Sequence, residues 1–144
     1  MDLSIQVTLD CTDPHTQAVW WARTLGWTVE PIEPGFIRKM VDAGQATEAD
    51  TMEFNGELVW RIGAGICPVD QVGQLPRQRM VFQRVPEPKT VKNRMHLDLH
   101  PGTDKDELRD KLVARGASFL YAGNQGPFTW YTMADPEGNE FCIS

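Results

Sequence analysis

The stretch Asn93-Arg94-Met95-His96-Leu97-Asp98-Leu99-His100 carries the pattern from which the fold is predicted. Apolar and polar side chains alternate along it, and a period of two is typical of a strand with one apolar and one polar face. The polar face carries two of the chain's three histidines, His96 and His100, with Asp98 between them. We therefore predict a strand over residues 93–100 whose polar face lines a cavity.

The same order of elements occurs near the start of the chain, at an offset of 90 residues. Residues 3–12 alternate in the same way, and the offset places Gln6 at the position of His96. After each of these strands, a capping residue, a helical pattern and a glycine follow in the same order. The capping residues and glycines are Asp13, Gly26, Thr103 and Gly116. A repeated order of elements predicts two copies of one unit.

Turn and breaker residues predict the remaining elements. The predicted strands cover residues 3–12, 27–32, 57–63 and 80–85 in the first copy, and 93–100, 117–121, 128–133 and 140–143 in the second. The helix of the first copy covers residues 14–25, and that of the second lies between Thr103 and Gly116. Residues 64–78 are predicted to be a loop, and Asn55-Gly56 a turn that joins residues 51–54 to the following strand. Residues 33–50 are expected to be an irregular loop with at most one helical turn, either a lid over a site or a plain surface excursion.

Each copy therefore has the order βαβββ, and the fold class is predicted to be α+β. Pro86-Glu87-Pro88 begins a proline-rich linker, because proline cannot continue a ladder of hydrogen bonds. We predict one domain over residues 1–144, with a first module over about 1–86, a linker over 86–92 and a second module over about 93–144.

Bulk composition restricts the classes of function. A chain of 144 residues with 41% hydrophobic content is long enough for one compact core. The net charge of −6 argues against nucleic-acid binding, which needs a basic surface. No stretch resembles a signal peptide or a membrane span, and three widely spaced cysteines are typical of reduced thiols. We expect a cytoplasmic protein that binds neither nucleic acid nor membrane.

The order of these features resembles the vicinal-oxygen-chelate superfamily, which includes glyoxalase I, bleomycin-resistance proteins and extradiol dioxygenases. The resemblance is strongest to its branch of glyoxalase-like domains, and it covers nearly the whole chain. Its motifs are Asp13-Pro14, Leu25-Gly26-Trp27, Phe82-Gln83-Arg84-Val85-Pro86-Glu87, residues 93–99 and Asp135-Pro136-Glu137-Gly138-Asn139. The resemblance implies a mixed sheet that curves around a central cavity, with the helices outside, and a homodimer.

The resemblance also implies positions for a metal. In metal-dependent members, ligands come from the first and fourth strands of each module, and these places here hold Gln6, Gln83, His96 and Cys142. His96 fits, but neutral amides bind divalent ions poorly. Glu140 lies on the same face as Cys142 and is the candidate substitute, so the candidate metal set is Gln6, His96 and Glu140. The metal would be a single divalent ion: zinc, nickel, manganese or iron.

Each candidate side chain also has a structural alternative. His96 is either a ligand or a histidine hydrogen-bonded to Asp98 or to a backbone group, and Cys142 is either a reactive thiol or a small buried hydrophobe. Trp60 and Trp130 are either cavity walls or core residues. His15 and His100 are expected to be solvated, and Trp20 and Trp21 to pack in the core or a dimer interface.

Two functions remain open from the sequence. The first is a small-molecule-binding protein of the resistance-protein type with a degenerate metal site. The candidate cavity residues are Gln6, Thr8, Trp60, Gln83, His96, Asp98, Trp130, Glu140 and Cys142. The alternative is a metal-dependent lyase, isomerase or dioxygenase that acts on a substrate with vicinal oxygens, in which Asp98 orients His96. A bare structural module would give no reason for a polar strand face inside a curved sheet.

Overall fold

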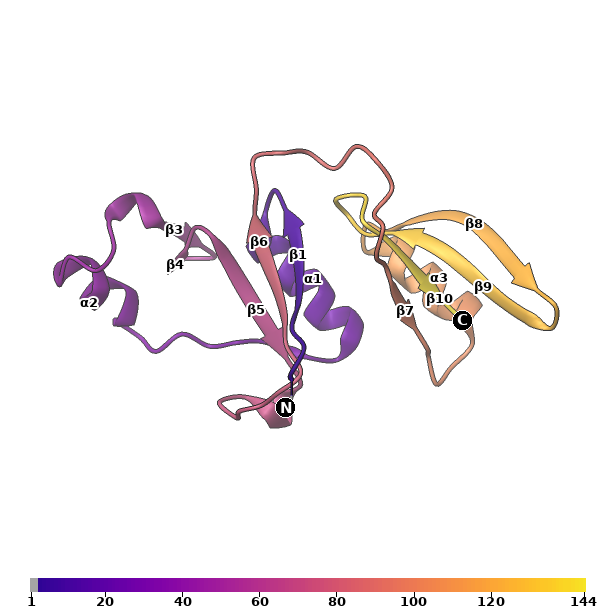
Figure 1. Cartoon of the computed structure of the whole chain (residues 1–144), viewed down its shortest axis with the longest axis horizontal. Coiled ribbons are helices and arrows are strands. Elements are labelled where there is room, and N and C mark those ends of the chain that lie inside the picture. Colours follow the sequence, from indigo (N-terminus) through magenta and orange to yellow (C-terminus); the bar gives the residue numbers. More distant parts are fainter. Residues whose placement is uncertain (1–2) are drawn as a thin grey trace. The chain divides into compact units, whose positions relative to one another are not determined.

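The computed structural model describes residues 3–144 and contains two compact units, the first ending at Glu87 and the second beginning at Pro88 (Figure 1). Each unit has its own four-stranded mixed sheet and its own long helix. The α+β class and the two βαβββ modules are therefore confirmed. Within residues 3–144, no helix is both long enough and apolar enough to cross a membrane.

The first unit follows the βαβββ order once a long insertion is set aside. Its elements are β1 (Val7–Cys11), α1 (Pro14–Leu25), β2 (Thr28–Val29), β5 (Gly63–Cys67) and β6 (Met80–Arg84). The sheet order is β1-β6-β5-β2, with β1 parallel to β6 and β5 antiparallel to both of its neighbours. A short 3₁₀ helix, η2 (Val69–Gln71), lies between β5 and β6.

Helix α1 begins and ends where the sequence predicts. The Asp13 side chain accepts a hydrogen bond from the Thr16 backbone N–H at 3.2 Å, Pro14 occupies the first turn, and Gly26 ends the helix in the left-handed conformation. The helix packs on β5 and β6. Trp21 and Phe82 are fully buried in this core, so the tryptophan belongs to the unit's own interior.

The insertion between β2 and β5 contains α2 (Phe36–Asp42), the 3₁₀ helix η1 (Glu48–Asp50) and a hairpin of β3 (Thr51–Phe54) and β4 (Glu57–Trp60). Asn55 and Gly56 both have positive φ angles, 50° and 79°, as a two-residue hairpin turn requires, and this predicted hairpin is confirmed. Residues 33–50 are more regular than expected, because the seven residues of α2 make about two turns of helix.

The third strand of the first module was wrongly predicted. Residues 57–60 pair only with β3 in the separate hairpin, and the strand of the sheet is β5, of which all but Gly63 falls in the segment expected to be a loop. Its sequence, Gly-Ala-Gly-Ile-Cys, has little of the β-branched character that marks strands. Gly63 is required there by packing, because a Cβ atom would lie 2.4 Å from the Phe82 carbonyl oxygen.

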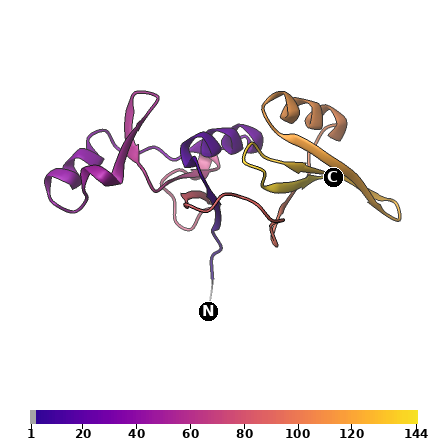
Figure 2. The same cartoon turned by 90° about the horizontal axis from the view of Figure 1, so that it is seen from above.

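The second unit repeats the topology without an insertion. Its elements are β7 (Leu97–Leu99), α3 (Lys105–Ala114), β8 (Ser118–Gln125), β9 (Phe128–Ala134) and β10 (Glu140–Ile143). The sheet order β7-β10-β9-β8 corresponds strand by strand to β1-β6-β5-β2, and β7 is parallel to β10. Figure 2 shows α3 on one face of this sheet, which leaves the opposite face free of helix.

Several predicted boundaries in the second unit need correction. Of the strand predicted over residues 93–100, only β7 pairs with a neighbouring strand. Met95, which was predicted to lie on the apolar face of that strand, is 88% exposed. Asp104, not Thr103, caps α3, because its side chain accepts a hydrogen bond from the Asp106 backbone N–H at 2.7 Å. The turn before β10 is confirmed: Asp135 accepts hydrogen bonds from the backbone N–H groups of Glu137 and Asn139.

The other first-module strands are also shorter than predicted. β1 begins at Val7, and Ile5 is 84% exposed, while β2 covers only two of residues 27–32. Both segments lie at sheet edges or ends, where side-chain alternation continues after the hydrogen-bonded ladder has stopped.

Candidate functional site

The helix-free face of the second sheet carries three predicted site residues close together. His96 Nε2 lies 3.2 Å from Asp98 Oδ1, and one donor atom each of His96, Asp98 and Cys142 lie within 4.8 Å of one another. The register explains this cluster, because Asp98 is paired with Cys142 across the parallel β7–β10 ladder. Cys142 Sγ is also 3.5 Å from Thr132 Oγ1 on the adjacent strand.

The cluster offers one imidazole nitrogen, one carboxylate oxygen and one sulfur. This donor set suits a borderline ion such as Zn²⁺ better than a hard ion such as Mg²⁺. Its His96 and Asp98 side chains are 39% and 56% exposed, so the three groups are accessible to an ion or a ligand. The triad differs from the predicted metal set, in which Asp98 was a supporting residue.

Glu140 is engaged elsewhere in the second unit. Lys89 Nζ lies 2.9 Å from one carboxylate oxygen, and the Asn93 backbone N–H donates to the other at 3.1 Å. Burial alone would raise the pKa of Glu140, but the Lys89 ammonium and the Asn93 N–H outweigh it and lower the pKa below its usual value. A carboxylate held in this way fits poorly as the substitute metal ligand.

The sheet of the first unit also carries an ion-pair network. Arg77 and Arg79 both bind the Glu30 carboxylate, at 3.0 Å and 2.8 Å, and Arg79 Nη1 also donates to Gln6 Oε1 at 3.0 Å. Burial opposes ionisation of Glu30, but its two arginine partners lower its pKa below the usual value. Gln6 lies beside Thr8, with Nε2 3.5 Å from Oγ1.

This network bears on the metal prediction for the first unit. The Gln6 oxygen, the atom that would bind an ion, accepts a hydrogen bond from a guanidinium group. Gln83 supplies only a second amide. These neutral and occupied groups do not fit a divalent ion. Neither arginine nor Glu30 was singled out from the sequence, because charges on short strand ends are usually solvated and no pattern marks their convergence.

A cavity of about 1030 Å³ lies between the first sheet and the insertion. Trp60 and Gln83, both predicted, line it, as do Val81 and the Glu30–Arg79 pair. Its volume is close to the upper limit for small-molecule sites, which are typically about 300–1,000 Å³ with apolar walls and a few polar groups. The first unit therefore contains a cavity suitable for an organic molecule.

His15 also lines this cavity and was wrongly expected to be solvated. It is only 5% exposed, its Nε2 lies 2.7 Å from the Trp60 carbonyl oxygen, and its ring lies against Phe54. The hairpin of the insertion covers the first turn of α1, and sequence periodicity cannot reveal such a long-range contact.

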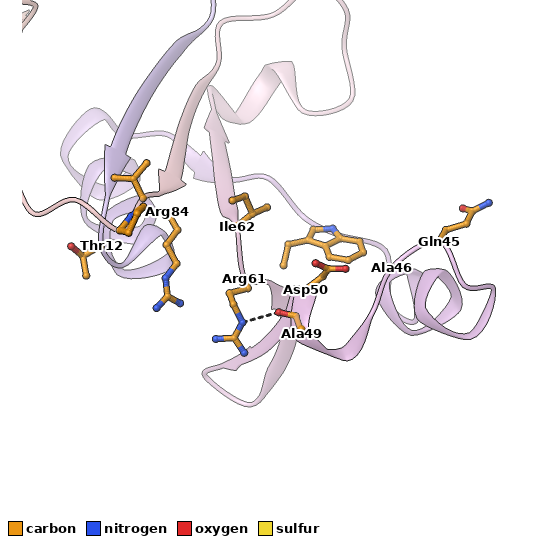
Figure 3. A pocket seen from close by; sticks show the side chains of 11 residues that line it. Thr12, Gln45, Ala46, Ala49, Asp50, Arg61, Ile62 and Arg84 are labelled. Carbon is orange, nitrogen blue, oxygen red and sulfur yellow. Dashed lines mark hydrogen bonds between the residues drawn. The ribbon is translucent and has the colours of Figure 1, made fainter.

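A second cavity of about 680 Å³ shares Trp60 and Ile62 with the first. Figure 3 shows the side chains that line this second cavity. Its polar lining includes Arg61, Arg84 and Asp50.

In the second unit, Trp130 lies flat over Gly123, where a Cβ atom would be 2.3 Å from the indole ring. Trp130 shares the helix-free face with Thr132, because alternate residues of a strand point to the same side.

All three cysteines are free thiols, and Cys11 and Cys67 are buried while Cys142 is partly exposed. Cys142 is therefore not the fully buried hydrophobe of the structural alternative. Burial also raises the pKa of the Cys67 thiol.

Comparison with solved structures supports the same architecture. The chain is similar to a genomically encoded fosfomycin resistance protein from Listeria monocytogenes, with a TM-score of 0.59, 8% identity and coverage of 99% of this chain and 92% of that one. It is also similar to a glyoxalase/bleomycin resistance protein/dioxygenase family enzyme from Burkholderia phytofirmans, with a TM-score of 0.56, 16% identity and coverage of 96% and 94%. At such identities the likeness shows the fold alone.

A glyoxalase family protein from Bacillus cereus is a third similar structure, with a TM-score of 0.55, 13% identity and coverage of 96% of this chain and 89% of that one. No curated protein sequence matches the chain significantly. The sequence model of the glyoxalase-like domain matches residues 6–144, nearly the full length. The chain therefore belongs to the glyoxalase-like domain family, as its resemblance to the glyoxalase-like branch of the vicinal-oxygen-chelate superfamily predicted.

Proposed function

We propose that this protein binds a small amphipathic organic molecule in the larger cavity of its first unit and uses no metal there. The observation that carries the proposal is a cavity of about 1030 Å³ with Trp60 and Val81 in its wall and the Glu30–Arg79 pair and Gln83 as polar groups. An aromatic wall provides contact area, and the few fixed polar groups select orientation. The family match supports a small-molecule role but does not name the ligand.

The test is a cavity-filling variant. Aromatic and antibiotic-like small molecules are first screened for those that raise the melting temperature, since a ligand that binds only the folded state stabilises it. The strongest binder is then titrated calorimetrically into the wild type and Val81→Trp. Val81 lines the cavity and is only partly buried, so the added indole occupies the cavity rather than the core. We expect at least about a tenfold loss of affinity.

Val91→Trp is the matched control, because Val91 is 76% exposed and lies outside this cavity. Val91→Trp should bind the same ligand with the affinity of the wild type. Equal affinity of Val81→Trp and the wild type, with both variants folded, would overturn the proposal.

A second candidate function is a metal-dependent lyase, isomerase or dioxygenase that acts on a substrate with vicinal oxygens. The observation in its favour is the group of His96, Asp98 and Cys142, whose donor atoms lie within 4.8 Å of one another. These residues would hold one divalent ion, which would supply Lewis-acid chemistry. Elemental analysis after incubation with Zn²⁺, Ni²⁺, Mn²⁺ or Fe²⁺ tests it: about one ion per chain, lost in His96→Ala, supports the enzyme, and no stoichiometric ion contradicts it.

We also propose that the protein is a homodimer. Large apolar side chains are exposed on both units, including Leu75 at 86% and Phe128 at 73%, and an interface between copies would cover such groups. Light scattering coupled to size-exclusion chromatography should give twice the chain mass of 16.3 kDa. A mass equal to that of one chain would contradict the dimer.

A further inference from the structure

The smaller cavity of the first unit has a charge pattern that the larger cavity lacks. It lies beside η1, the link between β4 and β5, and the end of β6, and its volume is about 680 Å³. Figure 3 shows the side chains of Arg61 and Arg84 extending to the same side of the sheet from two different segments. Both arginines line the cavity, with Asp50 as their acidic neighbour there.

The two arginines differ in what already binds them. Arg61 has a structural role: its Nε donates to the Ala49 carbonyl at 3.0 Å and its Nη2 to the Thr51 carbonyl at 2.8 Å. Among residues 3–144, by contrast, the Arg84 guanidinium has no hydrogen-bond or ion-pair partner, although its backbone N–H is fixed to the Ile62 carbonyl at 2.7 Å. The cavity lining therefore includes a guanidinium group on an anchored backbone, and its five N–H donors have no partner within residues 3–144.

Asp50 does not neutralise this cation directly. Its Oδ2 accepts hydrogen bonds from the Thr47 backbone N–H at 2.8 Å and from Thr47 Oγ1 at 3.1 Å, as part of a capping box on η1. With two arginines and one engaged carboxylate, the charge of the cavity lining is net positive. Arginine binds carboxylates through two parallel hydrogen bonds, a geometry that a point charge cannot match.

The same cavity also has an apolar wall. Trp60 and Ile62 form it, and the Trp60 backbone carbonyl is bound to His15 at 2.7 Å. The edge-on contact between Phe36 and the Trp60 ring, with centroids 6.5 Å apart, further restrains the indole. A rigid aromatic wall beside an available guanidinium matches a flat apolar body that carries a carboxylate. A volume of about 680 Å³ is also far larger than an inorganic anion needs.

We propose that this smaller cavity is a separate binding site for an aromatic carboxylate, with Arg84 binding the carboxylate and Trp60 and Ile62 contacting the ring. The proposal does not depend on the larger cavity, which has its own polar groups. Arg84 lies on the exposed end of β6, so its substitution should leave the fold intact.

The experiment compares a matched pair of probes, 1-naphthoate and its neutral amide, 1-naphthamide, by calorimetric titration at low ionic strength. The wild type should bind the carboxylate about tenfold more tightly than the amide, as expected for a hydrogen-bonded charge that is partly exposed to solvent. Arg84→Gln should lose that preference, and Arg84→Lys should retain part of it. Val81→Trp, which fills the larger cavity, should bind both probes as the wild type does.

Arg23→Gln is the control for net charge, because Arg23 is exposed on α1 and does not line the cavity. It should keep the full preference for the carboxylate. A preference that is absent in the wild type, that survives in Arg84→Gln, or that disappears equally in Arg23→Gln would overturn the proposal. A melting temperature unchanged in Arg84→Gln ties a lost preference to the site rather than to unfolding.

Discussion

Glu30 is the position at which a single substitution should most clearly test the energetics of the first unit. Its carboxylate binds both Arg77 and Arg79, and its side chain is only 17% exposed. Glu30→Gln keeps the shape but removes the charge, which leaves two partly buried guanidinium groups without their counterion. Breaking a fully buried ion pair costs about 3–5 kcal/mol, because the remaining charge has lost its solvent and its partner.

The expected magnitude here is smaller than that limit. The side chains of Arg77 and Arg79 are 18% and 32% exposed, so water screens part of their interaction with Glu30. We therefore expect Glu30→Gln to lower the free energy of unfolding by about 1–3 kcal/mol at pH 7. Urea denaturation followed by far-ultraviolet circular dichroism measures this loss.

The pH dependence gives an independent check of the cause. The pKa of Glu30 is lowered in the folded protein, so its charge stabilises the fold above the unfolded-state pKa of about 4.3. That contribution is lost as the pH falls through the folded-state pKa, where the wild-type carboxyl becomes neutral. The stability difference between the wild type and Glu30→Gln should therefore shrink once the pH falls below about 4.

Glu48→Gln is the matched control, because Glu48 also pairs with an arginine, Arg38, but both side chains are largely exposed, at 70% and 47%. It should change stability little, since water screens this pair. Equal losses in the two variants, or a Glu30→Gln effect that stays constant from pH 7 to pH 3, would refute the reasoning.

Two further predictions concern packing and thiol accessibility. Gly63→Ala should destabilise the protein by about 1–3 kcal/mol in urea denaturation, because the new Cβ would lie 2.4 Å from the Phe82 carbonyl oxygen and the backbone must shift. Gly102→Ala is the control and should leave the stability unchanged, because its new Cβ meets nothing within 4 Å. Equal effects of the two substitutions would contradict this reason. With an aromatic disulfide reagent, Cys142 should react rapidly in the folded protein while the two buried cysteines react only in denaturant, so that one thiol per chain is counted first and three afterwards. Simultaneous reaction of all three would show that the buried thiols are open to solvent.

Local signals in the sequence were sufficient for much of the architecture. The capping side chain of Asp13, the left-handed Gly26 and the Asn55-Gly56 turn each depend on residues close in the chain, and all three occur as predicted. Alternation along residues 95–99 correctly placed His96 and Asp98 on one face, because the period of a strand is a property of the backbone itself.

Tertiary structure decided the features that depend on distant residues. Strand β5 has a sequence of weak strand character, and it forms because β6 supplies its hydrogen-bond partners. The close approach of the Phe82 carbonyl oxygen also requires glycine at position 63. The burial of His15 and the pairing of Glu30 with two arginines likewise join segments about 45 or more residues apart. The sequence by itself thus determined the family, the repeat and the polar strand faces. Only the folded chain decided which charged side chains are paired, which residues line the cavities, and that Arg84 has no partner among the described residues. These properties depend on long-range contacts that no local pattern encodes.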